Sequence, residues 1–223
     1  MANSDFWVDV YDFFGQGSFT ATQGDNAPFR IADTSAAGTP TYVYVDGSSS
    51  GEVAVDFDAQ NEVQNVCLYQ GDILQYDIDK IREVKFRVKM NQAALNATSQ
   101  FAFGITGDRN DAIDSIAQAA LFRVVGADST TNVVVESDDG TNDNNDVATG
   151  KTLINAYKEF TINLATGTDD VRFFIDGEPV ATGTTFDMSN YTGSLQLFAQ
   201  ISKTADTNTD GFTIDRIEIR GIR

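Results

Sequence analysis

The sequence predicts an all-β protein, a two-sheet antiparallel sandwich with at most one short helix. In several segments apolar residues alternate with polar residues at a period of two, which indicates strands with one buried face. Clusters of Gly, Asp, Asn, Ser and Thr separate these segments, as is typical of turns between short antiparallel strands. A chain of 223 residues is long enough to bury a sizeable core. We therefore expect a single domain.

The clearest strand is "REVKFRVKM", residues 82–90. One face of this strand carries Val84, Phe86, Val88 and Met90, and the other carries Glu83, Lys85, Arg87 and Lys89. The same alternation predicts strands in "EFTINL", "VRFFID" and "SLQLFAQI". Shorter strands are predicted in "YVYV", "VAVDF", "FAFGI", "LFRVV" and "NVVVE".

Three connecting segments have distinct signals. Ile113, Ile116, Ala117 and Ala120 have helical spacing, which predicts a short helix or a helical turn. The polar stretch "ESDDGTNDNNDVATG", residues 136–150, is expected to be one long loop. Asp176 and Gly177 are expected to form a type I′ hairpin turn, because both residues tolerate positive φ.

Composition excludes several functions. The formal net charge is -18, so a phosphate backbone is repelled and nucleic acid is not an expected partner. The chain has no histidine, which excludes histidine-based triads and removes the commonest zinc ligand. Cys67 lies in the apolar run "VCLY" and is expected to be a buried thiol. Because the N-terminus "MANSDFWVDVYDFF" lacks a basic region and no segment is long enough to span a membrane, we expect synthesis in a cytoplasm without a signal peptide and no membrane partner.

The C-terminal third resembles a known superfamily. "YKEFTINLATGTDDVRFFIDGEPVATG" followed by "GSLQLFAQISKTADTNTDGFTIDRIEIRG" is similar to the last strands of the concanavalin A-like lectin and glucanase superfamily, which includes laminin G-like sandwiches. The hairpin motif is carried by Val171, Phe173, Ile175, Asp176, Gly177 and Val180, and the closing strand by Ile214, Asp215 and Ile217. From about Gly51 the upstream strands also fit. The resemblance implies a concanavalin A-like jelly roll, an architecture shared by lectins, glycosidases, adhesion modules and virion proteins.

The glycosidases of that superfamily carry carboxylates in the form E-x-D-x-x-E, because retaining hydrolysis needs two carboxyl groups about 5 Å apart. The nearest match is "VDFDAQNE", in which Asp56 and Asp58 share a strand face and Glu62 lies beyond it. Asp215 and Glu218 point to opposite faces of their strand. We therefore expect that the protein is not an enzyme.

Three hypotheses about function follow. We favour a non-enzymatic structural protein of a virus particle, similar to the capsid decoration or cement proteins of tailed phages. Such a protein is expected on the capsid surface of the virion, after synthesis in the host cytoplasm. It would bind the major capsid protein and itself, as a homotrimer. The alternatives are a lectin-like module that binds glycans and a degenerate glycoside hydrolase.

The N-terminus is rich in aromatic residues without a regular period. The expected domain is 1–223, with residues 1–50 as a candidate N-terminal arm or extension. Two interpretations of the aromatic cluster stay open: it binds a neighbouring subunit or capsid protein, or it caps the open end of its own sandwich. The candidate partner-binding residues are Phe6, Trp7, Tyr11, Phe13 and Phe14.

A candidate metal site lies in "TADTNTDG", where Asp206, Asn208 and Asp210 have the D-x-N-x-D-G spacing of calcium loops. In a helix-flanked calcium loop the twelfth position is a bidentate glutamate, but here it is Ile217, and strands flank the segment. Two interpretations remain: a calcium site completed by backbone carbonyls and another loop such as residues 138–146, or a solvated turn. Calcium is thus the one cofactor that the sequence suggests.

Overall fold

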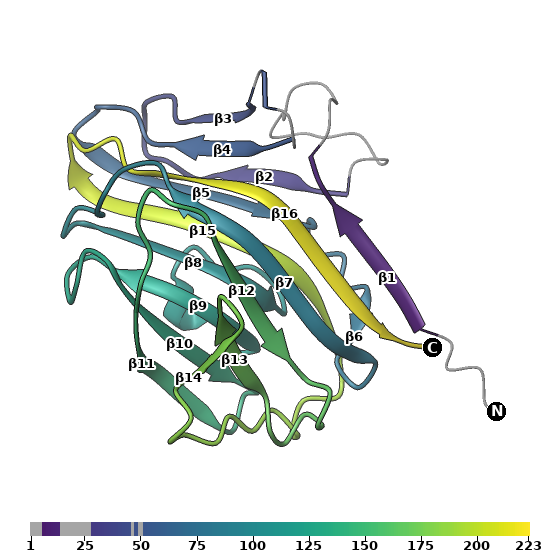
Figure 1. The fold of residues 1–223 in the computed structure, drawn as a ribbon. Coiled ribbons are helices and arrows are strands. Elements are labelled where there is room, and N and C mark those ends of the chain that lie inside the picture. Colours follow the sequence, from purple (N-terminus) through teal and green to yellow (C-terminus); the bar gives the residue numbers. More distant parts are fainter. Residues whose placement is uncertain (1–5, 14–27, 46, 49–50) are drawn as a thin grey trace.

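The computed structural model describes residues 6–13, 28–45, 47–48 and 51–223. These residues form two stacked antiparallel sheets (Figure 1). Sheet A has the strand order β14-β13-β12-β7-β16-β4-β3, with β1 also paired to β16. Sheet B has the order β11-β10-β9-β8-β15-β5-β2, with β6 also paired to β15. The jelly-roll sandwich predicted from the sequence is confirmed.

The strands occupy much of the described chain. In the N-terminal half they are β1 (Phe6–Tyr11), β2 (Arg30–Asp33), β3 (Thr41–Tyr44), β4 (Val53–Asp56), β5 (Glu62–Tyr69), β6 (Tyr76–Asp77), β7 (Ile81–Met90) and β8 (Ser99–Thr106). In the C-terminal half they are β9 (Ala119–Val125), β10 (Asn132–Asp138), β11 (Asp143–Thr152), β12 (Lys158–Asn163), β13 (Arg172–Ile175), β14 (Glu178–Val180), β15 (Ser194–Asp206) and β16 (Gly211–Ile222). A single 3-10 turn, η1 (Ile113–Ser115), is the helical element of the described residues, and none of their helices is long enough to cross a membrane.

The core lies between the two sheets, as the period-two alternation predicts. The apolar face of β7 is fully buried, and the equivalent faces of β8, β9, β12 and β15 meet it from both layers. At the centre Phe103 packs edge-on against Phe160, with ring centroids 4.9 Å apart. Burial of this apolar surface is the main source of the stability of the sandwich.

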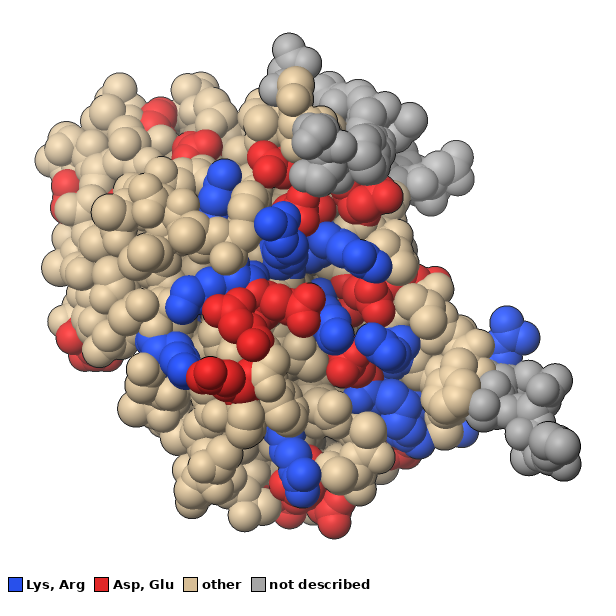
Figure 2. All heavy atoms as spheres, viewed as in Figure 1, with Lys and Arg blue, Asp and Glu red and all other residues tan. Residues whose placement is uncertain are grey.

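The outward face of sheet A is charged. Basic and acidic side chains alternate over β7, β12 and β16, and Figure 2 shows them grouped on this side of the molecule. The ion pairs on this face include Arg220 with Glu83 (2.7 Å) and Arg216 with Glu218 (2.6 Å). Because these pairs face water, each contributes little to stability. The polar residues of "REVKFRVKM" lie on this outward face, as the alternation in the sequence predicts.

The hairpin between β13 and β14 has the predicted turn. Asp176 has a φ of 51° and Gly177 a φ of 79°, the two positive values that a type I′ turn requires. Phe173 pairs with Val180 and Ile175 with Glu178 across this turn. The motif that suggested the superfamily therefore forms the expected hairpin.

The prediction of one long loop over residues 136–150 is wrong. Residues 136–138 complete β10, and β11 (Asp143–Thr152) pairs with it as an edge strand. The side chains of β11 are exposed or half-buried on both faces, so the strand has no apolar alternation to reveal it. Register shifts in the pairing also break the regular ladder.

Candidate functional site

The outer face of sheet B carries a polar surface partly covered by a loop. On β15 the side chains of Leu197, Ala199 and Ile201 point into the core, so Phe198 and Gln200 point outward. Both outward side chains are nevertheless buried. The cover is the segment 107–118, which connects β8 to β9 and contains η1.

The apolar half of this face is sealed by that loop. Ile113 and Ile116 pack on Phe198 and Leu121 in a second hydrophobic cluster, separate from the main core. Cys67 belongs to this cluster and is fully buried, as the sequence predicts. Burial raises the pKa of its thiol well above the usual value, so Cys67 is not a nucleophile.

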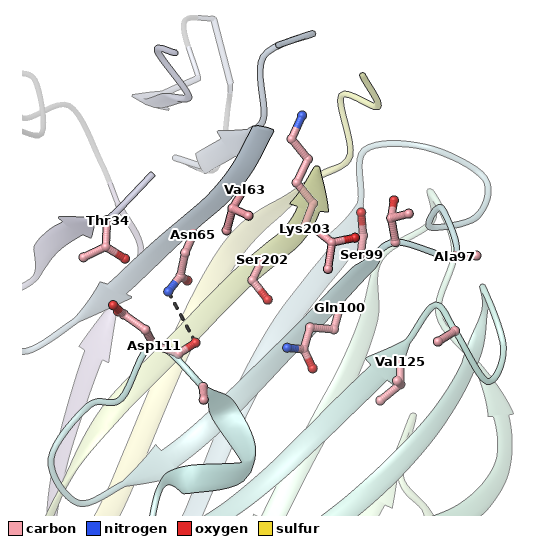
Figure 3. Close-up of a pocket in the computed structure, with 14 residues that line it drawn as sticks. Thr34, Val63, Asn65, Ala97, Ser99, Gln100, Asp111, Val125, Ser202 and Lys203 are labelled. Atoms are coloured by element: carbon pink, nitrogen blue, oxygen red, sulfur yellow. Dashed lines mark hydrogen bonds between the residues drawn. The ribbon is translucent and has the colours of Figure 1, made fainter. Parts of the chain in front are cut away.

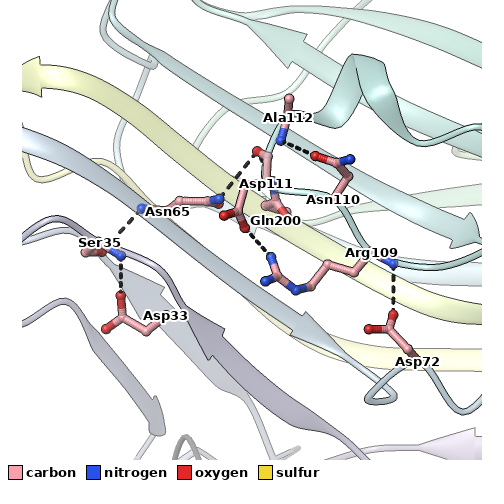
Figure 4. Close-up of polar contacts among 9 residues, drawn as sticks. All are labelled: Asp33, Ser35, Asn65, Asp72, Arg109, Asn110, Asp111, Ala112 and Gln200. Carbon is pink, nitrogen blue, oxygen red and sulfur yellow. Dashed lines mark hydrogen bonds and ion pairs between the residues drawn. The ribbon is translucent and has the colours of Figure 1, made fainter.

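The polar half of the face centres on the backbone carbonyl of Asp111. Two amide side chains from neighbouring strands donate to this carbonyl: Asn65 Nδ2 at 3.3 Å and Gln200 Nε2 at 2.9 Å (Figure 4). These two bonds fix the orientation of both amides. As a result Asn65 Oδ1 and Gln200 Oε1 are buried and have no donor within the described protein.

A pocket of about 570 Å³ opens beside this arrangement (Figure 3). Its walls come from β5, β8, β15, the end of β9 and the covering loop, and they include Val63, Asn65, Gln100, Asp111, Val125 and Ser202. The lining contains both small apolar side chains and polar side chains. The pocket therefore combines contact surface for C–H groups with acceptors for hydroxyl groups.

Next to the pocket, a buried cation is shared among carboxylates. Arg123 on β9 is 2% exposed and pairs with Glu136 on β10, which is 3% exposed. The same guanidinium lies 2.5 Å from Asp114 and 3.5 Å from Asp146, and its Nη2 donates to Gln100 Oε1 at 3.2 Å. Burial raises the pKa of Glu136, and the neighbouring Arg123 opposes that rise. Glu136 is thus held in an ion pair and does not face the pocket as a free acid.

The carboxylates considered for hydrolysis lie elsewhere. Asp56 ends β4 in sheet A and accepts a hydrogen bond from Asn91 Nδ2 at 2.6 Å. Asp58 lies beyond the strand, where its carboxylate accepts bonds from the backbone N–H groups of Thr39 (2.5 Å) and Gln60 (3.0 Å). The two carboxylates therefore do not share one strand, and neither lines the pocket.

The N-terminal aromatic residues divide into two groups. In the first group, the rings of Trp7 and Tyr76 stack with their centroids 5.5 Å apart. The Tyr11 ring packs edge-on against Phe29, with centroids 5.0 Å apart, and Phe13 is buried against the same Phe29 ring. These contacts cap the protein's own sandwich. Phe6 is 60% exposed on the opposite face of β1, and its role in binding a partner stays a prediction. Phe14 lies outside the described residues.

The side chains of the D-x-N-x-D-G segment are engaged by the chain between β7 and β8 and by the start of β8. Asp206 Oδ2 accepts from Thr98 Oγ1 (2.8 Å), and Asp210 Oδ2 accepts from the backbone N–H of Asn96 (2.8 Å). Asn208 Oδ1 accepts from Ser99 Oγ at 3.3 Å. Within the described residues no group of three or more acidic or cysteine side chains forms a metal site. The calcium site remains an untested prediction.

Sequence reasoning missed the pocket and the Arg123–Glu136 pair. A signal for the pair was present, because "LFRVV" and "NVVVE" each place one charged residue in an otherwise apolar strand. Opposite charges at such positions favour neighbouring strands. The pocket residues gave no comparable signal, because they come from distant strands and only the sheet order brings them together.

Comparisons with known proteins define the fold. No family model matches the sequence, and no curated protein matches it. Among solved structures, the chain is similar to the carbohydrate recognition domain of Emp47p, with a TM-score of 0.59, 9% identity and coverage of 96% of this chain and 97% of that one. It is also similar to a Bacteroides ovatus mixed linkage glucan GH16 protein in complex with a G4G4G3G product, with a TM-score of 0.61, 10% identity and coverage of 95% and 99%.

A third similar structure is SO2946 from Shewanella oneidensis MR-1, a protein of unknown function, with a TM-score of 0.59, 12% identity and coverage of 100% and 89%. The chain therefore has the concanavalin A-like lectin and glucanase sandwich fold, which confirms the resemblance seen in the sequence. This fold is shared by carbohydrate-recognition domains and glycosidases.

Proposed function

We propose that this protein is a carbohydrate-binding module that holds a neutral, hydroxyl-rich ligand in the pocket on the outer face of sheet B and does not hydrolyse it. The observation that carries the proposal is Asn65 Oδ1, a buried acceptor without a donor on a residue that lines the pocket. A buried acceptor without a donor costs about 1–3 kcal/mol, so a ligand that supplies hydroxyl donors gains this energy on binding.

The surroundings favour a sugar over other donors. Val63 and Val125 offer apolar contact to ring C–H groups, and Ser202 offers a hydroxyl for an additional hydrogen bond. The net charge of -18 disfavours anionic ligands. The similarity to a carbohydrate recognition domain and to a glucan-bound GH16 protein supports the same ligand class.

We expect no hydrolysis because of the state of Glu136. It is the buried acid on the outer face of sheet B, and Arg123 holds it in an ion pair. A general acid must deliver its proton to the glycosidic oxygen, and a nucleophile must reach the sugar ring. A carboxylate enclosed by a guanidinium does neither.

The experiment is a screen of neutral glycans, followed by calorimetry of the best ligand with Asn65→Ala and Ser202→Ala, two variants of residues that line the pocket. Each variant is expected to bind about tenfold more weakly, because each loses one hydrogen bond to the ligand. The matched control is Gln75→Ala, since Gln75 is an exposed amide outside the pocket. Thermal melts of all variants verify folding. Failure of every glycan to bind, or equal affinity of all variants, would contradict the proposal.

A second candidate function is the virion structural role, and the surface of β1 favours it. Phe6, Val8 and Val10 alternate along one face of this strand and are 60%, 52% and 46% exposed. β1 pairs with β16 on one side, and it is not paired on the other side by any described strand. An exposed apolar row on an edge strand is a typical binding surface. We propose that it contacts the major capsid protein of a tailed phage and supports a homotrimer.

Light scattering and sedimentation with purified phage heads test this role. The native protein is expected to be a trimer that sediments with heads. A variant with Phe6→Ser, Val8→Ser and Val10→Ser should lose both properties while keeping its melting temperature. Val43→Ser, at a 49% exposed position on β3, is the control. A monomer that does not bind heads would exclude the role.

A further inference from the structure

Lys203 is a buried ammonium group enclosed by backbone carbonyls. The residue is 2% exposed and lies near the end of β15, on the core-facing side of the strand. Its Nζ donates to the carbonyls of Asp58 at 2.8 Å, Gln60 at 3.1 Å and Asn208 at 2.9 Å. A lysine has three donors, so all of them are used.

These carbonyls come from two separate parts of the chain. Asp58 and Gln60 belong to the connection between β4 and β5, and Asn208 belongs to the turn between β15 and β16. The Phe57 ring lies 5.3 Å from Nζ and closes the core side of the site. Lys203 is also among the residues that line the pocket, and in Figure 3 its ammonium group points away from Ser202 and Gln100.

The charge around this group is negative. Asp58, Asp206, Glu62 and Asp210 all interact favourably with the ammonium, while burial lowers the pKa of Lys203. The side chains of Asp206, Asn208 and Asp210 turn to the chain between β7 and β8 and to β8, as described above. What the turn presents to Lys203 is therefore a neutral backbone oxygen.

We propose that the Lys203 ammonium takes the place of a bound metal ion between these loops and holds the β4–β5 connection and the β15–β16 turn together. Its removal leaves a carbonyl-lined site that accepts a small alkylammonium ion. A calcium ion orders loops in the same way, because oxygen ligands from separate loops surround one positive charge. Here the chain supplies the charge itself. The inference is independent of the proposed function.

The test uses Lys203→Ala, which lacks three methylenes and the ammonium, and propylammonium, which restores all four groups. The variant is expected to melt roughly 5–10 °C below the native protein, because three carbonyls lose their donor. Propylammonium at molar excess should recover a large part of this loss, and propanol should not. Lys80→Ala, at an exposed lysine, is the matched control and should show neither effect.

The native protein is melted in parallel with calcium and with excess chelator. Equal melting temperatures are expected, because Lys203 already provides the cation. Several outcomes would overturn the proposal. These are an unchanged melting temperature in Lys203→Ala, a response to propylammonium that the native protein and Lys80→Ala share, or a calcium-dependent rise in the native protein. Lys203→Met, which keeps the aliphatic stem, should be destabilised without rescue; full stability of this variant would also count against the proposal.

Discussion

Arg123 and Glu136 form an ion pair between diagonal positions on adjacent strands, β9 and β10, and both are almost completely buried. Arg123 Nε has no acceptor within the described protein, so the guanidinium is not fully satisfied. The pair lies on the same face as the pocket, and Arg123 also donates to Gln100, which lines that pocket. Loss of this ion pair would therefore affect both the stability of the sandwich and the position of Gln100 in the pocket wall.

We predict that Arg123→Met destabilises the protein by about 3–5 kcal/mol, because Glu136 is left buried without a partner. Replacing both residues, with Arg123→Met and Glu136→Met, should recover most of this loss. Denaturant unfolding of the native protein, both single variants and the double variant gives the coupling energy. Additive effects of the two single substitutions would show that the pair does not act as a unit.

A second prediction concerns acid stability. Asp139 is 5% exposed and accepts bonds from the backbone N–H groups of Asn142 (2.7 Å), Asn190 (3.0 Å) and Thr141 (2.9 Å). Burial opposes ionisation of Asp139, but these donors outweigh it and lower its pKa. Because the pKa is lower in the folded state, its stabilisation is present above the unfolded pKa of about 3.9 and is lost as the pH falls through the folded value.

Asp139→Asn should therefore cost about 2 kcal/mol at neutral pH, and the difference from the native protein should shrink below about pH 4. Urea unfolding at a series of pH values measures it. The exposed Asp169→Asn is the control and should leave the curve unchanged. A difference that stays constant down to the lowest pH at which the protein folds would show that the ionised form of Asp139 is not stabilised.

The third prediction is negative. No release of reducing sugar is expected from common β-glucans, because the described carboxylates offer no free pair in the pocket. A measured rate that Asp56→Asn or Asp58→Asn abolishes would overturn this. A rate abolished by Glu136→Gln would instead assign catalysis to the ion-paired acid.

The fourth prediction tests the hairpin turn. Gly177 has a φ of 79° and open space around the position of a Cβ atom, so Gly177→Ala pays only for backbone conformation. The expected loss is about 1 kcal/mol, or roughly 2–4 °C in melting temperature. Gly183 is equally open but lacks a positive φ, so Gly183→Ala should have no comparable effect. Equal melting temperatures for the two variants would remove the conformational explanation.

The sequence predicted those strands that have one buried face. Val84, Phe86 and Val88 on β7 alternate with polar residues, and burial on one side of a pleated strand produces this pattern directly. β11 was missed because neither of its faces is buried. Edge strands of this type are held by backbone hydrogen bonds, which leave no trace in the side-chain pattern.

The candidate site was less predictable than the fold. Asn65, Gln100 and Gln200 are separate amides that attract no notice in the sequence, and their meaning depends on the order β8-β15-β5 in sheet B. Asn65 and Gln200 both donate to the backbone carbonyl of Asp111. Every residue has such a carbonyl, so the sequence does not indicate which one will bind side chains. Even the D-x-N-x-D-G spacing was ambiguous, because its side chains are engaged by residues about 110 positions away, as in the contact between Asp206 and Thr98 with a separation of 108.

The covering loop also closes one side of the pocket, and this would limit which part of a long ligand could enter. Asp111 and Ala112 form one wall, and Ile113 and Ile116 continue it as a packed apolar cover over the rest of the sheet face. An open groove accepts the interior of a polymer, whereas a face blocked on one side accepts only an end or a short branch. A glycan bound here would therefore present its terminal unit, and the number of chain ends in a sample, rather than its mass, would set how much protein it binds.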